Sequence, residues 1–301
     1  MSWIELKGIS KRFTTASGPV TALQGVTASL PKGAIIGLLG PNGSGKTTLL
    51  RILMGILPAD SGEVWCEGSP LSASLRRTFG YMPEERGLYP KMRAEDQLSY
   101  FLQLKGYSAK EAQKEIRYWA ERMEAPWLHR PARALSKGMQ QKVQLILALA
   151  GNPPFLLLDE PFSGLDPVVA TEVETILRER VQSGATLLLS THRLEQADHL
   201  CDYVLLIHKG QLRLAGQTAA LKQQYKTHSY EIETSAPLDA LPWPTEVTLS
   251  PHTSHRATIH VSSTLTGKAL LELLLPHTDV RFFAEKLPTI KEIFLQTVTT
   301  A

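Results

Sequence analysis

Short apolar runs and longer segments of helical character alternate along most of the chain. The apolar runs have the length and composition of buried strands, whereas the longer segments have the length and composition of helices, and the one that begins at Lys46 has no helix breaker before Gly55. The predicted strands cover residues 34–39, 155–158 and 186–189, and the predicted helices cover residues 46–54, 137–150 and 168–182. Strands that alternate with helices are typical of a parallel sheet covered by helices. The pattern therefore predicts an α/β fold.

One stretch departs from this alternation. Between Ala94 and Met123 apolar residues recur at helical spacing among many charged residues, and no strand pattern interrupts them. We interpret this stretch as the centre of a helical subdomain that covers about residues 88–135.

The pattern changes again after Tyr225. Prolines break short β-like runs such as 257–261, and later segments predict a helix at 267–275, a strand at 280–287 and a helix from Thr289. Thr289 and Glu292 have the spacing of a helix capping box. We therefore predict two domains, a large one over residues 1–225 and a small α+β domain over residues 226–301.

Composition limits the partners and the compartment. The net charge is only +3, and no basic run is long enough to follow a nucleic-acid backbone, so no nucleic acid is expected as a partner. Cys66 and Cys201 form neither a disulfide framework nor a paired metal motif, which fits the cytoplasm. The most apolar region, residues 143–158, is broken by Gly and Pro before it reaches the roughly 20 residues that a membrane helix needs. We expect that the chain does not cross a membrane by itself.

A glycine-rich loop follows the first predicted strand. It has two glycines with four residues between them, then Lys and a hydroxyl residue, which is the phosphate-binding loop pattern. Glycines let backbone N–H groups surround phosphate oxygens, and the helix that follows directs its positive end at the same anion. We expect Lys46 to reach the terminal phosphates of ATP and Thr47 to hold Mg²⁺. The loop residues are Gly40, Pro41, Asn42, Gly43, Ser44, Gly45, Lys46, Thr47 and Thr48.

Two carboxylates end the apolar strand at residues 155–158. Asp159 is predicted to hold Mg²⁺ directly or through water, and Glu160 to polarise the attacking water. The strand at 186–189 leads to His192, which would lie near the terminal phosphate if the two strands are adjacent. These residues make ATP hydrolysis the predicted chemistry.

From about Ile4 to Tyr225 the chain resembles the ATP-binding subunits of ABC transporters, a family of P-loop NTPases. Besides the loop, the carboxylate pair and His192, residues 135–141 resemble the family signature and residues 163–166 resemble the loop after the catalytic Glu. Phe13 resembles the aromatic residue that stacks on adenine, and Val20 and Ala22 are expected in the same base pocket.

The resemblance implies several partners. Ser136, Lys137 and Gly138 would bind the γ-phosphate of ATP held by a second copy, so the working unit would be a homodimer. A membrane-spanning permease would dock between Glu84 and Leu135, and the subunit would lie at the inner face of the cell membrane. Residues Leu88, Tyr89, Pro90 and Met92 could form an apolar groove for a permease helix. Alternatively, they form a buried loop.

Two departures from the family pattern stand out. The family often has Gly and Gln at the positions of Lys137 and Met139. It usually has a metal-touching Gln at the position of Glu84, where this chain has a carboxylate that can still coordinate Mg²⁺.

The tail from His228 resembles the accessory domain of exporter-type subunits, and export is the function that this tail favours. An importer ATPase and a soluble ABC ATPase that acts on ribosomes or DNA remain alternatives. The soluble proteins tend to have tandem cassettes or a long coiled coil, and this chain has one phosphate loop and no long heptad run.

Overall fold

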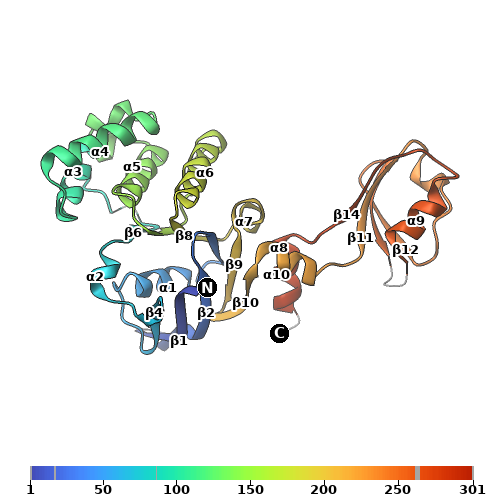
Figure 1. The fold of residues 1–301 in the computed structure, drawn as a ribbon, viewed down its shortest axis with the longest axis horizontal. Helices are drawn as coiled ribbons and strands as arrows, with labels where there is room; N and C mark the ends of the chain where they lie inside the picture. Colours follow the sequence, from blue (N-terminus) through green and yellow to red (C-terminus); the bar gives the residue numbers. More distant parts are fainter. Residues whose placement is uncertain (1, 17, 86, 262–264, 300–301) are drawn as a thin grey trace. The chain divides into compact units, whose positions relative to one another are not determined.

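The chain folds into two compact units. The computed structural model describes residues 2–16, 18–85, 87–261 and 265–299. The units divide after Thr218, so nearly all of α8 (Thr218–Gln224) belongs to the second unit (Figure 1). This division comes earlier along the chain than the predicted boundary at Tyr225.

A six-stranded sheet forms the centre of the first unit. Its strand order is β10-β9-β3-β8-β7-β6. All its neighbouring strands pair in parallel except β10, which is antiparallel to β9. The strands are β3 (Ile35–Leu39), β6 (Gly80–Met82), β7 (Phe155–Asp159), β8 (Thr186–Thr191), β9 (Tyr203–His208) and β10 (Gln211–Gln217). The predicted parallel sheet is confirmed, and its parallel strands end at one edge.

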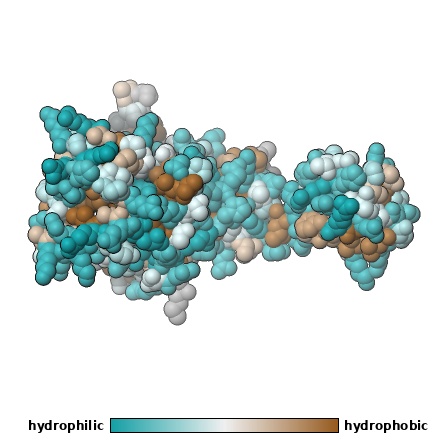
Figure 2. Space-filling view, turned by 90° about the horizontal axis from the view of Figure 1, so that it is seen from above, coloured by the Kyte–Doolittle hydropathy of each residue, from teal (hydrophilic) through white to brown (hydrophobic). Residues whose placement is uncertain are grey.

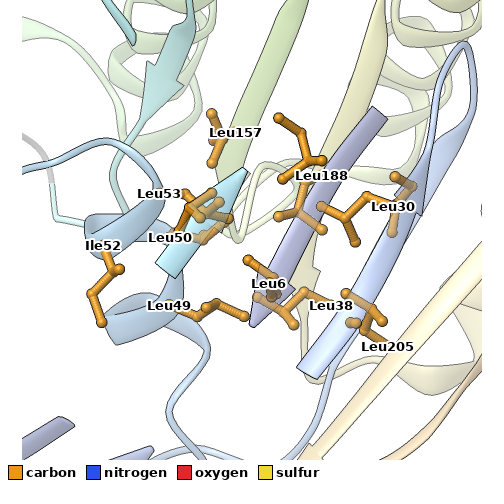
Figure 3. Close-up of a cluster of buried hydrophobic side chains, with 14 of the residues drawn as sticks. Leu6, Leu30, Leu38, Leu49, Leu50, Ile52, Leu53, Leu157, Leu188 and Leu205 are labelled. Atoms are coloured by element: carbon orange, nitrogen blue, oxygen red, sulfur yellow. The ribbon is translucent and has the colours of Figure 1, made fainter. Parts of the chain in front are cut away.

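A second, antiparallel sheet has the order β2-β1-β4-β5. It consists of β1 (Ser2–Thr15), β2 (Gly18–Pro31), β4 (Ser61–Cys66) and β5 (Ser69–Pro70). Side chains of β1 and β2, of α1 (Lys46–Leu53) and of the parallel sheet share one buried cluster (Figure 3). Burying one leucine contributes roughly 1.5–3 kcal/mol, so this cluster holds α1, and with it the phosphate loop, against the sheet. The labelled members are Leu6, Leu30, Leu38, Leu49, Leu50, Ile52, Leu53, Leu157, Leu188 and Leu205.

Helices make up the rest of the first unit. The predicted helical insert consists of α3 (Ala94–Leu104) and α4 (Ala109–Arg122), separated where Gly106 adopts a positive φ and Ser108 and Glu111 form a capping box. The short α2 (Ala73–Arg76) precedes β6. The other helices are α5 (Lys137–Leu149), α6 (Pro167–Gln182) and α7 (Leu194–Leu200), and two 3-10 turns cover Pro126–His129 and Ala132–Ala134. The helix predictions at 137–150 and 168–182 are confirmed to within one residue at each end.

The second unit has a four-stranded antiparallel sheet of order β12-β13-β11-β14. Its strands are β11 (Ser229–Thr234), β12 (Val247–Pro251), β13 (Arg256–Val261) and β14 (Val280–Lys286), followed by α10 (Ile290–Thr299). A 3-10 turn covers Leu238–Ala240, and Leu270 and Leu274 of α9 (Gly267–Leu274) share a buried cluster with Ile232 and Ile259. The predicted capping box is confirmed, because the Glu292 carboxylate accepts from the Thr289 amide at 2.7 Å and the Thr289 hydroxyl accepts from the Glu292 amide at 3.2 Å.

In the described parts of both units, no helix combines the length and the apolar character that crossing a membrane requires.

Candidate nucleotide site

A cavity of about 360 Å³ lies where the parallel strands end. The phosphate loop follows β3, Glu84 follows β6, and Asp159 and Glu160 come at the end of β7. Ligands of open parallel sheets bind at this carboxyl edge. The lining residues are Val20, Thr21, Ala22, Asn42, Gly43, Gly45, Lys46, Thr47, Thr48, Glu84, Asp159 and Glu160.

The glycines of the loop are required by its shape. Gly40 and Gly45 have positive φ angles of 153° and 110°, which favour glycine. A β-carbon at Gly40 would overlap the backbone carbonyl of Ile207, and one at Gly45 would overlap that of Ala22. The loop can therefore curl tightly only with glycine at both positions, which leaves backbone N–H groups free to face a phosphate.

Lys46 is the single cation among the lining residues. Its side chain is buried, with 7% of the residue exposed, and Nζ donates to the carbonyls of Gly40 at 2.7 Å and Pro41 at 3.1 Å. Burial lowers the pKa of Lys46, and the negative charges of Glu160, Asp159 and Glu84 oppose that shift. The ammonium thus lies within electrostatic reach of all three carboxylates.

Asp159 is almost fully buried, with 1% exposed. Its Oδ1 accepts a hydrogen bond from the Ser190 hydroxyl, while its Oδ2 has no hydrogen-bond partner within the described residues. A buried carboxylate oxygen without a partner is costly unless a cation or donor meets it. Asp159 is therefore suited to a hard cation such as Mg²⁺. Thr47 and Glu84 add further oxygen atoms to the same cavity.

Glu160 and His192 are brought together because β7 and β8 are neighbours. Glu160 Oε1 accepts from the His192 amide at 3.0 Å and lies 2.7 Å from His192 Nδ1. The backbone of Glu160 has a positive φ of 51°, which costs a non-glycine residue about 1–2 kcal/mol. Its amide donates to Ser190 Oγ at 3.1 Å, and its carbonyl accepts from Gln141 Nε2 at 3.2 Å. These contacts hold the carboxylate in one position at the cavity wall.

Ser190 and Gln141 hold residues of the site in place, a role that the sequence did not predict for either of them. Ser190 bonds both Asp159 and the Glu160 amide, and Gln141 holds the turn after β7. A serine at the end of a leucine strand carries no special signal, and Gln141 lies in the segment 135–141 that resembles the family signature without pointing to this contact. Only the pairing of β7 with β8 and the position of α5 give them their roles.

The structure does not bring every predicted residue into the cavity wall. Phe13 lies opposite Val20 in the β1–β2 register and is 37% exposed, but it is not a lining residue. Ser136 caps α5 by accepting from the Met139 amide at 3.2 Å, and neither it nor Lys137 nor Gly138 lines this cavity. Gly40, Pro41 and Ser44 belong to the loop but do not line the cavity, and His192 contacts the lining residue Glu160.

A second cavity, of about 420 Å³, is more apolar. We call it the groove. Of the four residues proposed for a permease groove only Leu88 lines it, whereas Tyr89 is exposed and its ring stacks on Phe101. Because Tyr89 and Pro90 are exposed, this segment is not a buried loop. The groove is lined by Met54, Arg76, Arg77, Phe79, Tyr81, Pro83, Gly87, Leu88, Phe101, Leu104, Lys105, Gln144 and Leu147.

The fold and the phosphate loop define a P-loop nucleotide-binding protein, and comparison with known proteins gives its family. A sequence model described as ABC transporter matches residues 23–163, and one described as the C-terminal domain of DrrA1-3-like ATP-binding proteins matches residues 216–298.

Individual relatives agree with these matches. The chain is 33% identical over 286 residues to the uncharacterized ABC transporter ATP-binding protein YhaQ of Bacillus subtilis, which covers 95% of this chain and 96% of that protein. It is 36% identical over 234 residues to YbhF of Escherichia coli, a probable multidrug ABC transporter ATP-binding protein, covering 75% of this chain and 39% of YbhF. A solved structure of an ATP-binding subunit of an ABC transporter superposes with a TM-score of 0.66 and 29% identity, over 74% of this chain and 93% of that one.

The chain belongs to the ATP-binding subunits of ABC transporters, and it is an ATPase.

Proposed function

We propose that this ATPase powers export of a substrate through a separate membrane-spanning partner. The observation that carries the proposal is the meeting of a phosphate loop, two strand-end carboxylates and Glu84 in one cavity, beside an apolar groove that none of the described residues fills. ATP is hydrolysed in the nucleotide cavity, and the groove is a surface on which a membrane partner can dock and respond to that hydrolysis.

In the proposed mechanism Glu160 is the general base for the attacking water. Its Oε1 is held by His192, and the residue lines the cavity next to Lys46. Lys46 and His192 stabilise the charge that develops on the γ-phosphate. Thr47, Glu84 and Asp159 hold Mg²⁺, which neutralises the phosphates when bound. Phe13, Val20 and Ala22 contact the adenine.

We further propose that two copies share their ATP sites. Ser136 and Lys137 are exposed at the start of α5 and do not line the cavity of their own chain. Together with Gly138 they offer a helix N-terminus, which favours an anion, to the γ-phosphate bound by a second copy. Sedimentation of the chain with MgATP and without nucleotide tests this, since the dimer is expected only with ATP. A monomer under both conditions, with ATP bound, contradicts it.

The groove is proposed as the docking site of a permease helix. Its walls are largely apolar, and its lining holds three cations but no carboxylate. Arg76 Nε donates to the Leu53 carbonyl and Lys105 Nζ to the Leu147 carbonyl, while the Arg77 side chain has no hydrogen bond or ion pair within the described residues. On the face of the molecule drawn in Figure 2, apolar patches interrupt a mostly hydrophilic surface. An apolar permease segment with an acidic residue fits this lining, and it would hold the subunit at the inner face of the cell membrane.

Export is favoured over import by two matches. The second unit matches the DrrA1-3-like C-terminal domain, and the relative YbhF is described as a probable multidrug transporter subunit.

The direction can be tested with a multi-helix membrane protein that co-purifies with this chain. The two would be co-expressed, and inside-out vesicles would be supplied with ATP and a panel of sodium-22, cationic dyes and labelled lipids. Accumulation of one probe inside the vesicles supports export, and its ATP-driven release supports import. Failure of any membrane protein to co-purify, together with co-sedimentation of this chain with ribosomes or DNA, would favour the soluble alternative.

A further inference from the structure

The charges around the nucleotide cavity are unbalanced. Its lining contains three carboxylates, from Glu84, Asp159 and Glu160, and a single ammonium, from Lys46. All three carboxylates line the same cavity as Lys46 and act electrostatically on it, so a triphosphate bound beside Lys46 would share the cavity with them. A polyanion that enters this cavity meets more negative than positive charge.

The three carboxylates differ in how they are engaged. Asp159 accepts from Ser190, and Glu160 is held by His192. Glu84 is exposed, and its side chain makes no hydrogen bond or ion pair within the described residues. Its charge is therefore the one that other side chains compensate least.

We infer that Glu84 makes nucleotide binding dependent on a divalent cation, by repelling ATP that carries no metal. The inference rests on the proposed ATP site and deepens it. Without a cation, the carboxylate and the triphosphate repel each other across the cavity. A bound divalent cation turns this repulsion into a net attraction, because the carboxylate and the triphosphate then both face the same positive charge.

The size of the effect follows from Coulomb's law. Two unit charges several ångströms apart near a protein surface interact strongly enough to change a binding constant by about tenfold. Salt screens exposed charges, so the effect should be largest at low ionic strength.

The experiment compares Glu84→Gln with Glu85→Gln in the full chain. Glu85 is the next residue and is also exposed, but it does not line the cavity. The Glu85→Gln substitution therefore removes the same charge outside the site. The dissociation constant of trinitrophenyl-ATP is measured for both variants and the unchanged chain, in excess EDTA and in excess Mg²⁺, at low salt.

In EDTA the Glu84→Gln variant should bind about tenfold more tightly than the unchanged chain, and Glu85→Gln should not. In Mg²⁺ the Glu84→Gln variant should bind no more tightly, and its ratio of EDTA to Mg²⁺ dissociation constants should fall by about tenfold. The Glu84→Asp variant, which keeps the charge, should retain the weak binding in EDTA.

Three results would overturn the inference: equal affinity of Glu84→Gln and the unchanged chain in EDTA, equal tightening by Glu84→Gln and Glu85→Gln, or equal tightening in EDTA and Mg²⁺. Failure of the unchanged chain to bind nucleotide in Mg²⁺ would instead contradict the proposed function, which distinguishes the two failures.

Discussion

The nucleotide cavity and the groove lie in the same unit but are built in different ways. The cavity uses short contiguous segments in which backbone shape matters, such as the loop whose Gly40 and Gly45 adopt positive φ angles. The groove is lined by side chains that are spread along the sequence between Met54 and Leu147, and no single sequence motif contains them all. Chemistry on a phosphate needs fixed amides and carboxylates, whereas docking needs mainly apolar area and complementary charge.

The two cavities meet at one short stretch after β6. Pro83 lines the groove, and the next residue, Glu84, lines the nucleotide cavity. A partner that shifts the groove side of this stretch therefore acts on a residue of the ATP site. Substitutions that damage one cavity at a time separate the contributions of the two cavities.

The largest effect is expected from Glu160→Gln. Loss of the general base should lower ATP hydrolysis by about 10²–10⁴-fold while ATP binding persists. Steady-state phosphate release and nucleotide binding measure the two effects separately. Glu124→Gln is a matched control, because Glu124 also has a positive φ but is exposed and does not line the cavity. Hydrolysis near the normal rate in Glu160→Gln would exclude this residue as the base.

Lys46→Ala should weaken binding itself. The ammonium makes charge-assisted hydrogen bonds that are worth about 1.5–3 kcal/mol, so MgATP affinity should fall by roughly 10–100-fold. Equilibrium binding of a fluorescent nucleotide measures this. Lys32→Ala, which removes an exposed lysine paired with Glu67, should leave affinity unchanged. Unaltered affinity in Lys46→Ala would contradict its contact with the phosphates.

Leu88→Asp should act on the groove alone. A carboxylate placed in an apolar docking surface should weaken co-purification with the permease by about tenfold or more, because its desolvation is not compensated. Hydrolysis by the isolated subunit should not change. Ile56→Asp, which alters an exposed apolar residue that does not line the groove, serves as the control. If both variants co-purify normally, the groove is not the docking site.

Arg77→Glu should produce the smallest change. Reversing one exposed charge at the groove should reduce permease binding severalfold, with an effect that fades at high salt. Binding assays at two salt concentrations measure it, and Arg117→Glu on α4 gives the same reversal away from the groove. An equal loss in both variants would indicate a general effect of net charge.

Much of the first unit was predictable because its signals are local. The strands β7 and β8 end at Asp159 and Thr191, close to where their apolar runs stop, and α1, α5 and α6 span the predicted segments to within one residue at each end. In the second unit the sequence predicted the later elements, which are α9, β14 and α10 with its cap at Thr289. The compact units divide after Thr218 and not at the predicted Tyr225, a difference that the sequence did not predict because α8 has no feature in sequence that assigns it to either unit.

The chain's own sequence determined the phosphate loop, the strand-end carboxylates and the alternation of elements, because each depends on residues that are close together along the chain. Only the tertiary structure decided which strand lies beside which. The pairing of β7 with β8 places Ser190 and His192 against Asp159 and Glu160, and the packing of helices on the sheet gathers the groove. These contacts join residues that are distant in sequence, so they depend on long-range packing that no local pattern records.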